Sequence, residues 1–206
     1  MVFVATLVML AAVGFFIFRT TRQRPMVARQ THLPAASEAA VEESPRSSVS
    51  SLWYRYEAPT GDFSLALPPS WTQYTKRIEG FGPELKFAAW GISSERRGSP
   101  WLYVLKRPGD SWLEAKTYFE QARARVMVDP DVVRVSELTE MEFPDGAGYT
   151  FATVNKGAQG RRHTETLYAI LHDGYEYALV FLVPLEYKDD HDWLFDDIAK
   201  SFDILA

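Results

Sequence analysis

Alternating apolar and polar positions divide the chain beyond residue 52 into strands separated by turn sequences. Residues 53–57 and 63–67 flank the proline- and glycine-containing segment 58–62, which predicts a β-hairpin. Within residues 63–67 the odd positions are large and apolar and the even positions are small, the pattern of a strand covered on one face.

A structural corner is predicted directly after this hairpin. Pro68 and Pro69 end the hydrogen-bond ladder, because proline has no backbone N–H to donate. Trp71 follows where the chain leaves the sheet. We expect its ring to be buried, since burying a large aromatic side chain contributes about 2–3 kcal/mol.

A second antiparallel strand pair and a helix come next. Residues 85–92 and 101–107 are strand candidates separated by a polar loop. Residues 111–114 read Ser-Trp-Leu-Glu, a capping box that predicts a helix starting at Ser111. One side of this helix should carry the apolar residues spaced by three and four positions, namely Trp112, Ala115, Phe119, Ala122 and Val126.

The second half of the chain predicts a meander of four antiparallel strands. A two-residue turn is expected at Asp173-Gly174, where both positions need positive φ. The last strand is apolar on both faces, which predicts a central strand covered by helices on each side. The four strand candidates are residues 132–143, 149–155, 162–171 and 175–183.

A closing helix is predicted from Leu194, Ile198 and Phe202, which recur at four-residue spacing. The acids among residues 189–192 suit the positively polarised amino end of that helix. The fold class that follows is α+β, with an antiparallel sheet of about six to seven strands flanked by helices.

The amino-terminal residues 1–24 are predicted to be a transmembrane anchor with a basic flank. Residues 2–18 are uncharged and end in bulky side chains, which favours an uncleaved single-pass helix over a cleaved signal peptide. Arginines follow this run, so the positive-inside rule places the folded domain in the cytoplasm. A basic leader preceding Met1 would reverse that orientation. Residues 25–51, rich in Ala, Ser, Pro and Glu, are predicted to be a flexible linker to the domain at 52–206.

Composition narrows the function classes. The chain has no cysteine, which excludes disulfides, cysteine-ligated metal sites and a cysteine nucleophile. Residues 1–51 hold five arginines and three glutamates, so the remainder carries 17 basic and 24 acidic side chains, a net charge of −7. Because nucleic-acid binding needs an excess of basic side chains, nucleic acid is not expected as a partner.

Residues with catalytic or metal-binding chemistry are few. Residues 189–192 read Asp-Asp-His-Asp and could ligand a divalent cation, but their spacing fits no defined metal loop and helix polarity already explains the acids. His163, in a strand, and His172, before a turn, are expected to be exposed or turn histidines. The sequence contains no Gly-x-Ser-x-Gly, His-Glu-x-x-His or phosphate-binding glycine loop, so no catalytic residue, metal ligand or cofactor is assigned.

Two tryptophans stand in the paired strands of the first half. Trp90 and Trp101 are the kind of residue that usually packs in or beside a core. If one face of the sheet is left open, however, they would serve as aromatic anchors for a protein partner. They are therefore the partner-binding residues that the sequence predicts.

Four stretches of the chain carry a resemblance to a known family: Phe63-Ser64-Leu65-Ala66-Leu67-Pro68-Pro69-Ser70-Trp71, the helix from Ser111, Gly174-Tyr175-Glu176-Tyr177 and the ending Ile198-Ala199-Lys200-Ser201-Phe202. Together they resemble the family that includes the photosystem protein PsbP, the bacterial protein DcrB and the Mog-type Ran-binding proteins. The resemblance spans residues 53–206 and implies a PsbP-like α-β-α sandwich whose members mostly bind proteins and stabilise assemblies rather than catalyse. The membrane anchor and linker depart from the soluble members.

These observations predict a membrane-tethered, non-catalytic binding module that contacts a protein partner, for example an envelope or secretion assembly. Residues 2–18 would contact the membrane. A sensor domain for a small ligand or a divalent metal is the alternative, and a hydrolytic enzyme is a third hypothesis.

Overall fold

The computed structural model describes residues 52–75, 82–91, 98–110, 112–157 and 160–205. They form a large antiparallel sheet in the order β3-β4-β5-β10-β9-β8-β6, with β7 also paired to β8, and a small sheet in the order β1-β2-β11. The strands are β1 (Tyr54–Glu57), β2 (Phe63–Leu67), β3 (Trp71–Gln73), β4 (Leu85–Gly91), β5 (Trp101–Pro108), β6 (Val132–Val135), β7 (Thr139–Phe143), β8 (Gly146–Lys156), β9 (Arg162–His172), β10 (Tyr175–Pro184) and β11 (Asp203–Ile204).

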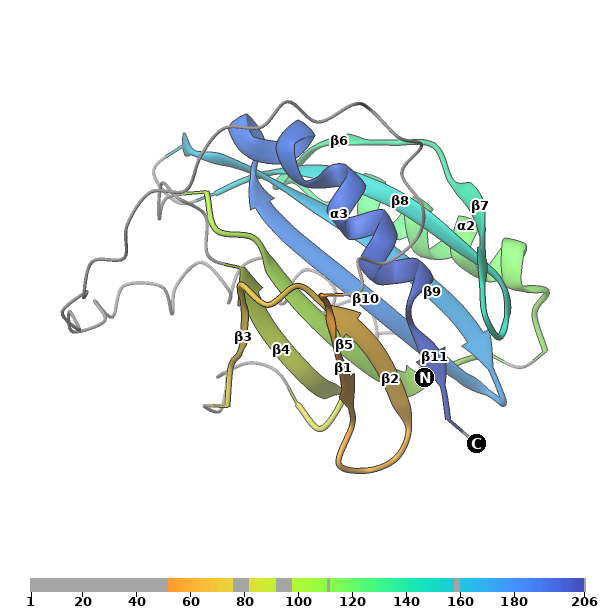
Figure 1. Cartoon of the computed structure of the whole chain (residues 1–206). Coiled ribbons are helices and arrows are strands. Elements are labelled where there is room, and N and C mark those ends of the chain that lie inside the picture. Colours follow the sequence, from red (N-terminus) through yellow and green to blue (C-terminus); the bar gives the residue numbers. More distant parts are fainter. Residues whose placement is uncertain (1–51, 76–81, 92–97, 111, 158–159, 206) are drawn as a thin grey trace, which may run out of the picture.

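The two faces of the large sheet are covered differently (Figure 1). Helix α3 (Lys188–Lys200), which follows the short 3-10 helix η2 (Leu185–Tyr187), lies on one face together with the small sheet. Helix α2 (Ala115–Met127) lies on the opposite face. The predicted α+β class is confirmed. The predicted count of six to seven strands is too low, because the large sheet alone has eight and the small sheet has three.

The central strand β10 supplies side chains to both cores. Residues 177–183 of this strand are all buried. The odd residues pack with Phe195 and Ile198 of α3, whereas the even residues lie in the core that contains Phe119 of α2. The predicted central strand, covered on both sides, is therefore confirmed. The turn that precedes it is also as predicted, with φ of 48° at Asp173 and 76° at Gly174.

Both faces of β2 are buried, which corrects the prediction of a strand covered on one face. All five residues are buried, and even Ser64 is 0% exposed. The small side chains of Ser64 and Ala66 lie under polar groups from elsewhere in the chain: Arg55 donates to the Ser64 hydroxyl, and Ser201 Oγ accepts from the Ala66 amide at 2.9 Å. The alternation of large and small residues therefore reflects a different covering layer on each face of β2. Neither face of the strand is open to water.

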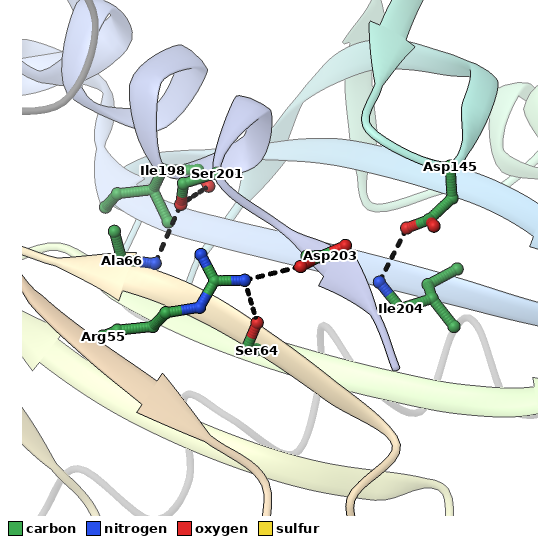
Figure 2. Close-up of polar contacts among 8 residues, drawn as sticks. All are labelled: Arg55, Ser64, Ala66, Asp145, Ile198, Ser201, Asp203 and Ile204. Atoms are coloured by element: carbon green, nitrogen blue, oxygen red, sulfur yellow. Dashed lines mark hydrogen bonds and ion pairs between the residues drawn. The ribbon is translucent and has the colours of Figure 1, made fainter. Parts of the chain in front are cut away.

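The end of the chain completes the small sheet (Figure 2). Strand β11 pairs antiparallel with β2, along the edge of β2 that does not pair with β1. Arg55 of β1 forms an ion pair with Asp203 at 2.6 Å, and the Ile204 amide donates to the Asp145 carboxylate at 2.6 Å. This two-residue strand was not predicted, because two residues carry no detectable period.

Trp71 is buried, as predicted, with 4% of its surface exposed. It begins β3 and pairs with Gly91 of β4. A side chain at position 91 would place its Cβ 2.9 Å from the indole Nε1 of Trp71. The absence of a side chain at Gly91 therefore provides the space that the Trp71 ring occupies.

The N-cap of helix α2 lies three residues later than the capping box predicts, at Glu114 rather than Ser111. Ser111 lies outside the described residues, and the first helical residue is Ala115, with Glu114 at the N-cap making no side-chain capping bond. Trp112 precedes the helix and is 94% exposed, so its predicted place on the packed side is wrong. The buried residues of the helix, Phe119 and Ala122, agree with the predicted spacing.

Residues 132–143 form two strands rather than the single strand predicted. β6 and β7 both pair with β8, at opposite ends of that long strand. Between them, the Ser136 amide donates to the carbonyl of Ala152, and the Ser136 hydroxyl accepts from the Ala152 amide. The break between the two strands is therefore held against β8 by a side chain as well as by the backbone.

Helix α2 is fixed to the sheet by a buried ionic contact. Glu176 of β10 is 0% exposed and accepts from Arg107 Nε and Nη2 of β5 at 2.7 and 2.6 Å. Its other donor is the Tyr118 hydroxyl of α2, at 2.5 Å. Burial, followed by the charge of Glu176, raises the pKa of Tyr118, so this hydroxyl stays protonated and donates. A charged, fully satisfied contact thus fixes where the amino end of α2 meets the sheet.

We expect Trp71→Ala to lower the free energy of unfolding by about 3–5 kcal/mol, because a buried indole would leave a cavity. Chemical denaturation monitored by circular dichroism would measure the change. Trp112→Ala is the matched control, since its exposed ring should change stability by less than about 0.5 kcal/mol. Equal stability of the two variants would contradict the packing of Trp71 described above.

We expect Tyr118→Phe to lower the free energy of unfolding by about 1.5–3 kcal/mol, because it removes a hydrogen bond to a buried carboxylate. Glu176→Ala should cost more, about 3–5 kcal/mol, since it leaves the Arg107 guanidinium without its partner. Urea titration would measure both. Tyr175→Phe, at a ring that is 43% exposed, is the control. If Tyr118→Phe matches that control, the ionic contact does not hold α2.

Candidate binding surface on the α2 face

The two predicted tryptophans lie side by side on the α2 face of the large sheet. Trp90 of β4 and Trp101 of β5 are directly paired across the two strands, so their side chains share a face. Their ring centroids are 6.5 Å apart, and both side chains are half-buried. Residues eleven positions apart in sequence are thus brought together by the antiparallel pairing of β4 and β5.

Two tyrosines extend this pair into a four-ring cluster, here called the aromatic row: Tyr74, Trp90, Trp101 and Tyr103. The Tyr74 ring meets the Trp101 ring edge-on, with 5.6 Å between the ring centroids. The Tyr103 ring stacks on the Trp101 ring, with 6.0 Å between the centroids and an interplanar angle of 7°. Tyr103 is 3% exposed, whereas Tyr74 is half-buried. Burial, followed by the negative charge of Glu165, raises the pKa of Tyr103.

Helix α2 packs over a different part of this face. Its main neighbours in the sheet are β6 and β8, and Phe119 of the helix meets Tyr149 of β8 at 5.5 Å between ring centroids. The helix also reaches Glu176 of β10 through the Tyr118 hydroxyl. The aromatic row lies on β4, β5 and the residue after β3. Tyr103 belongs to the same apolar core as Phe119, and Tyr74 and Trp101 pack against that core.

A polar group lies on the same face, further along the sheet from the aromatic row. It consists of Thr153 and Asn155 of β8 and His163 and Glu165 of β9, and is here called the polar cluster. Strand register pairs Thr153 with Glu165 and Asn155 with His163, which places all four side chains on one face. The cluster is linked to the aromatic row through Leu182, which pairs with both Trp101 and Glu165.

Contacts within the polar cluster run along each strand. The Asn155 amide Nδ2 donates to the Thr153 hydroxyl at 2.9 Å, and His163 Nε2 lies 3.1 Å from Glu165 Oε1. Asn155 Oδ1 is buried and has no hydrogen-bond partner. His163 is 6% exposed, which corrects the prediction that it is an exposed or turn histidine. The strand alternation could not reveal this, because burial here depends on the neighbouring strands.

The remaining polar residues singled out in the sequence do not converge on a site. His172 lies 3.6 Å from the Asp173 carboxylate, beside the turn as predicted. Among residues 189–192, Asp189 and Asp190 occupy the first turn of α3, and His191 Nδ1 lies 2.9 Å from the carbonyl of Tyr187. Within the described residues, no group of three or more His, Asp or Glu side chains is arranged to hold a metal ion.

Comparison with known proteins places the fold. The chain matches the Ran-binding protein Mog1p from Saccharomyces cerevisiae with a TM-score of 0.54 and 10% identity, covering 74% of this chain and 95% of that one. It matches LpqN, involved in cell envelope biogenesis of Mycobacterium tuberculosis, with a TM-score of 0.52 and 10% identity, covering 75% and 91%. The domain has the PsbP-like fold.

A further structural match is cyanobacterial PsbP from Synechocystis, with a TM-score of 0.48, 15% identity and coverage of 79% of this chain and 98% of that one. No family model and no curated protein sequence matches the chain. The PsbP-like fold that four sequence features predict is confirmed. At these identities the comparison speaks to the fold and assigns no functional residue.

The anchor and linker predictions fall outside the described residues, which start at Leu52. None of the helices in the described part of the chain has the length and apolar character needed to cross a bilayer.

Proposed function

We propose that this protein is a membrane-tethered, non-catalytic module that binds a protein partner through the aromatic row. The observation that carries the proposal is the direct pairing of half-buried Trp90 and Trp101 on β4 and β5, where Trp101 packs against the apolar core that α2 covers. Tryptophan and tyrosine are enriched at the energetic centres of protein interfaces, because they offer large rigid surfaces with polar edges.

The proposal is supported by proteins of the same fold. Mog1p is a Ran-binding protein, and LpqN is involved in cell envelope biogenesis. Neither description names a catalytic activity. Because a fold hosts many functions, the partner of this chain is not transferred from either protein.

The tether rests on residues 2–18 and the linker of residues 25–51. An uncharged run of that length suits a single membrane span, and a linker of that composition allows the domain to reach partners at a distance from the membrane. The basic flank places the domain on the cytoplasmic side under the positive-inside rule. The domain then contacts partners at or near that membrane surface.

We expect the double variant Trp90→Ala, Trp101→Ala to lose at least about tenfold of the partner recovered with the tagged full chain from solubilised membranes. Quantitative mass spectrometry of the eluates would measure this. Trp193→Ala, at a 50% exposed tryptophan of α3 on the other face, is the matched control. A partner recovered equally by both variants would contradict the proposed surface.

A second variant guards against misfolding of the double mutant. Thr72 of β3 is exposed and pairs with Trp90, so its side chain shares the face of the aromatic row. We expect Thr72→Arg to reduce partner recovery while leaving the thermal unfolding midpoint nearly unchanged, because exposed positions tolerate substitution. Full recovery with Thr72→Arg, together with an intact melt, would place the interface elsewhere.

We expect alkaline phosphatase fused after Ala206 to be inactive in an exporting bacterial host, and a green fluorescent protein fusion at the same position to be fluorescent. The reason is that the basic residues follow the predicted span and are retained in the cytoplasm. Phosphatase activity of the membrane fraction would reverse the proposed orientation and leave the binding surface unaffected.

A further inference from the structure

Apolar side chains are exposed at the corner where the end of α2 meets the edge strand β6. The exposed fraction is 55% for Met127, 78% for Val128 and 43% for Val133. Val128 is the C-cap of α2, and only a tight turn follows it, in which the Val132 amide donates to the carbonyl of Asp129 at 3.1 Å. Exposed apolar side chains that gather at one place indicate a surface that contacts a partner.

Basic side chains border these apolar residues. Arg134 of β6 pairs with Val154 of β8, and Lys156, two residues further along β8, pairs with Arg162 of β9. Because side chains alternate along a strand, the three basic side chains share one face of the sheet, and all three are exposed. This is the face that carries α3, whereas α2 reaches β6 from the opposite face. The edge at β6 is thus bordered from both sides (Figure 1).

No acid pairs with the basic side chains of this corner. Within the described part of the chain, no carboxylate lies at ion-pair distance from Arg134, Lys156 or Arg162, nor from the exposed Arg125 in the last turn of α2. The Lys156 Nζ donates instead to the carbonyl of Pro130, at 3.3 Å. The turn of residues 128–131 carries two aspartates, so a basic excess remains. These four basic residues and the three exposed apolar ones are here called the corner patch.

The composition of the corner patch suits a membrane surface that carries negative charge. Apolar side chains enter the boundary between lipid headgroups and acyl chains, and lysine and arginine attract anionic headgroups. The basic residues lie on four different elements around the apolar ones. That spread suits a surface of many headgroups better than one acidic peptide. A helix end, an edge strand and strand ends are also peripheral parts of the fold, which can meet a flat surface edge-on (Figure 1).

We propose that the corner patch docks the domain onto an anionic phospholipid bilayer. The proposal goes beyond the proposed function and rests on it only in placing the domain near a membrane. Residues 52–206 carry a net charge of −7, so the same lipids repel the rest of the domain. The contact therefore also sets which side of the domain faces the bilayer.

The aromatic row stays accessible in this orientation. It lies on β4, β5 and the residue after β3, and the strands β10, β9 and β8 separate β5 from β6. Four strand spacings correspond to about 19 Å. Lipid contact at one edge of the sheet and protein contact near the other edge are therefore compatible.

The test is fluorescence quenching at residue 133 in the full chain. The chain has no cysteine, so Val133→Cys takes a single nitrobenzoxadiazole label. The labelled chain is placed in nanodiscs of phosphatidylcholine, with or without phosphatidylglycerol, that carry a nitroxide at headgroup depth. We expect the lipid-bound fraction to rise at least about fivefold with the anionic lipid, the contribution of one basic side chain at such a surface. High salt should abolish the rise because it screens the attraction.

A second label position is the control for nearby lipid without contact. Tyr175 is 43% exposed and pairs with His172, at the opposite end of β9 from Arg162. A label on Tyr175→Cys should show the same weak quenching in both kinds of nanodisc. Quenching at residue 133 that is equal in neutral and anionic nanodiscs, or no stronger than at residue 175, would overturn the proposal.

Charge reversal locates the contact. Arg134→Glu combined with Lys156→Glu should remove the lipid-dependent quenching at residue 133, with a nearly unchanged thermal unfolding midpoint because both positions are exposed. Lys86→Glu combined with Lys116→Glu makes the same charge change at exposed positions of β4 and the first turn of α2, and should keep the quenching. Equal quenching in the two double variants would overturn the assignment to the corner patch.

Two further outcomes separate this inference from its neighbours. If soluble polyglutamate changes the fluorescence at residue 133 and anionic lipid does not, the corner patch binds an acidic protein and the lipid assignment is overturned. Failure of the chain to enter nanodiscs would reject the tether, and nanodiscs added in excess would still report lipid contact at residue 133. Partner recovery in the Trp90 and Trp101 double variant is measured separately and does not depend on either outcome.

Discussion

The fold depends on β10 being buried on both sides. An eight-stranded sheet with a central strand that is apolar on each face cannot leave either face to water, so both must be covered by other parts of the chain. The chain meets this requirement in two ways: α3 and the small sheet cover one face, and α2 covers part of the other. The burial of the other residues on each face follows from where these covers lie.

The cover over the α3 face is held at the end of the chain. Arg55, Ser64 and Asp203 connect the first strand, the second strand and the last in one polar contact, so the small sheet closes only when both ends of the domain are in place. On the other face, the buried Glu176 joins β5 and β10 to the first turns of α2. The helix packs mainly against β6 and β8, whereas the aromatic row lies on β4, β5 and the residue after β3.

The residues of the α2 face are buried to different extents. Within one sheet face, residues packed by α2 form an ordinary core, and their neighbours Trp90 and Trp101 are half-buried. Beside them, the buried Asn155 Oδ1 accepts no hydrogen bond, which is uncommon for a side chain so largely removed from water, whereas Glu165 is paired with His163. The paired rings of Trp90 and Trp101 are the reason why the proposed partner surface is assigned to this half of the face.

The sequence alone determined the local features of this protein: the β1–β2 hairpin, the proline stop before Trp71, the Asp173-Gly174 turn, the apolar alternation of β10 and the acids at the start of α3. These follow from backbone conformational preferences and residue period, which act between near neighbours in the chain. The PsbP-like fold could be predicted from a resemblance to a known family, carried by residues 63–71, the helix from Ser111, residues 174–177 and residues 198–202. The sequence also singled out Trp90 and Trp101 by residue type.

Only the tertiary structure decided what depends on strand register and on contacts between distant segments. The burial of Ser64 and of His163, the exposure of Trp112, the break between β6 and β7, and the two-residue strand β11 each result from neighbours far away in sequence. The polar cluster could not be predicted for the same reason, because Asn155 and His163 share a face through the register of β8 against β9. Side-chain alternation gives two faces for each strand, and only pairing decides which residues meet on one of them.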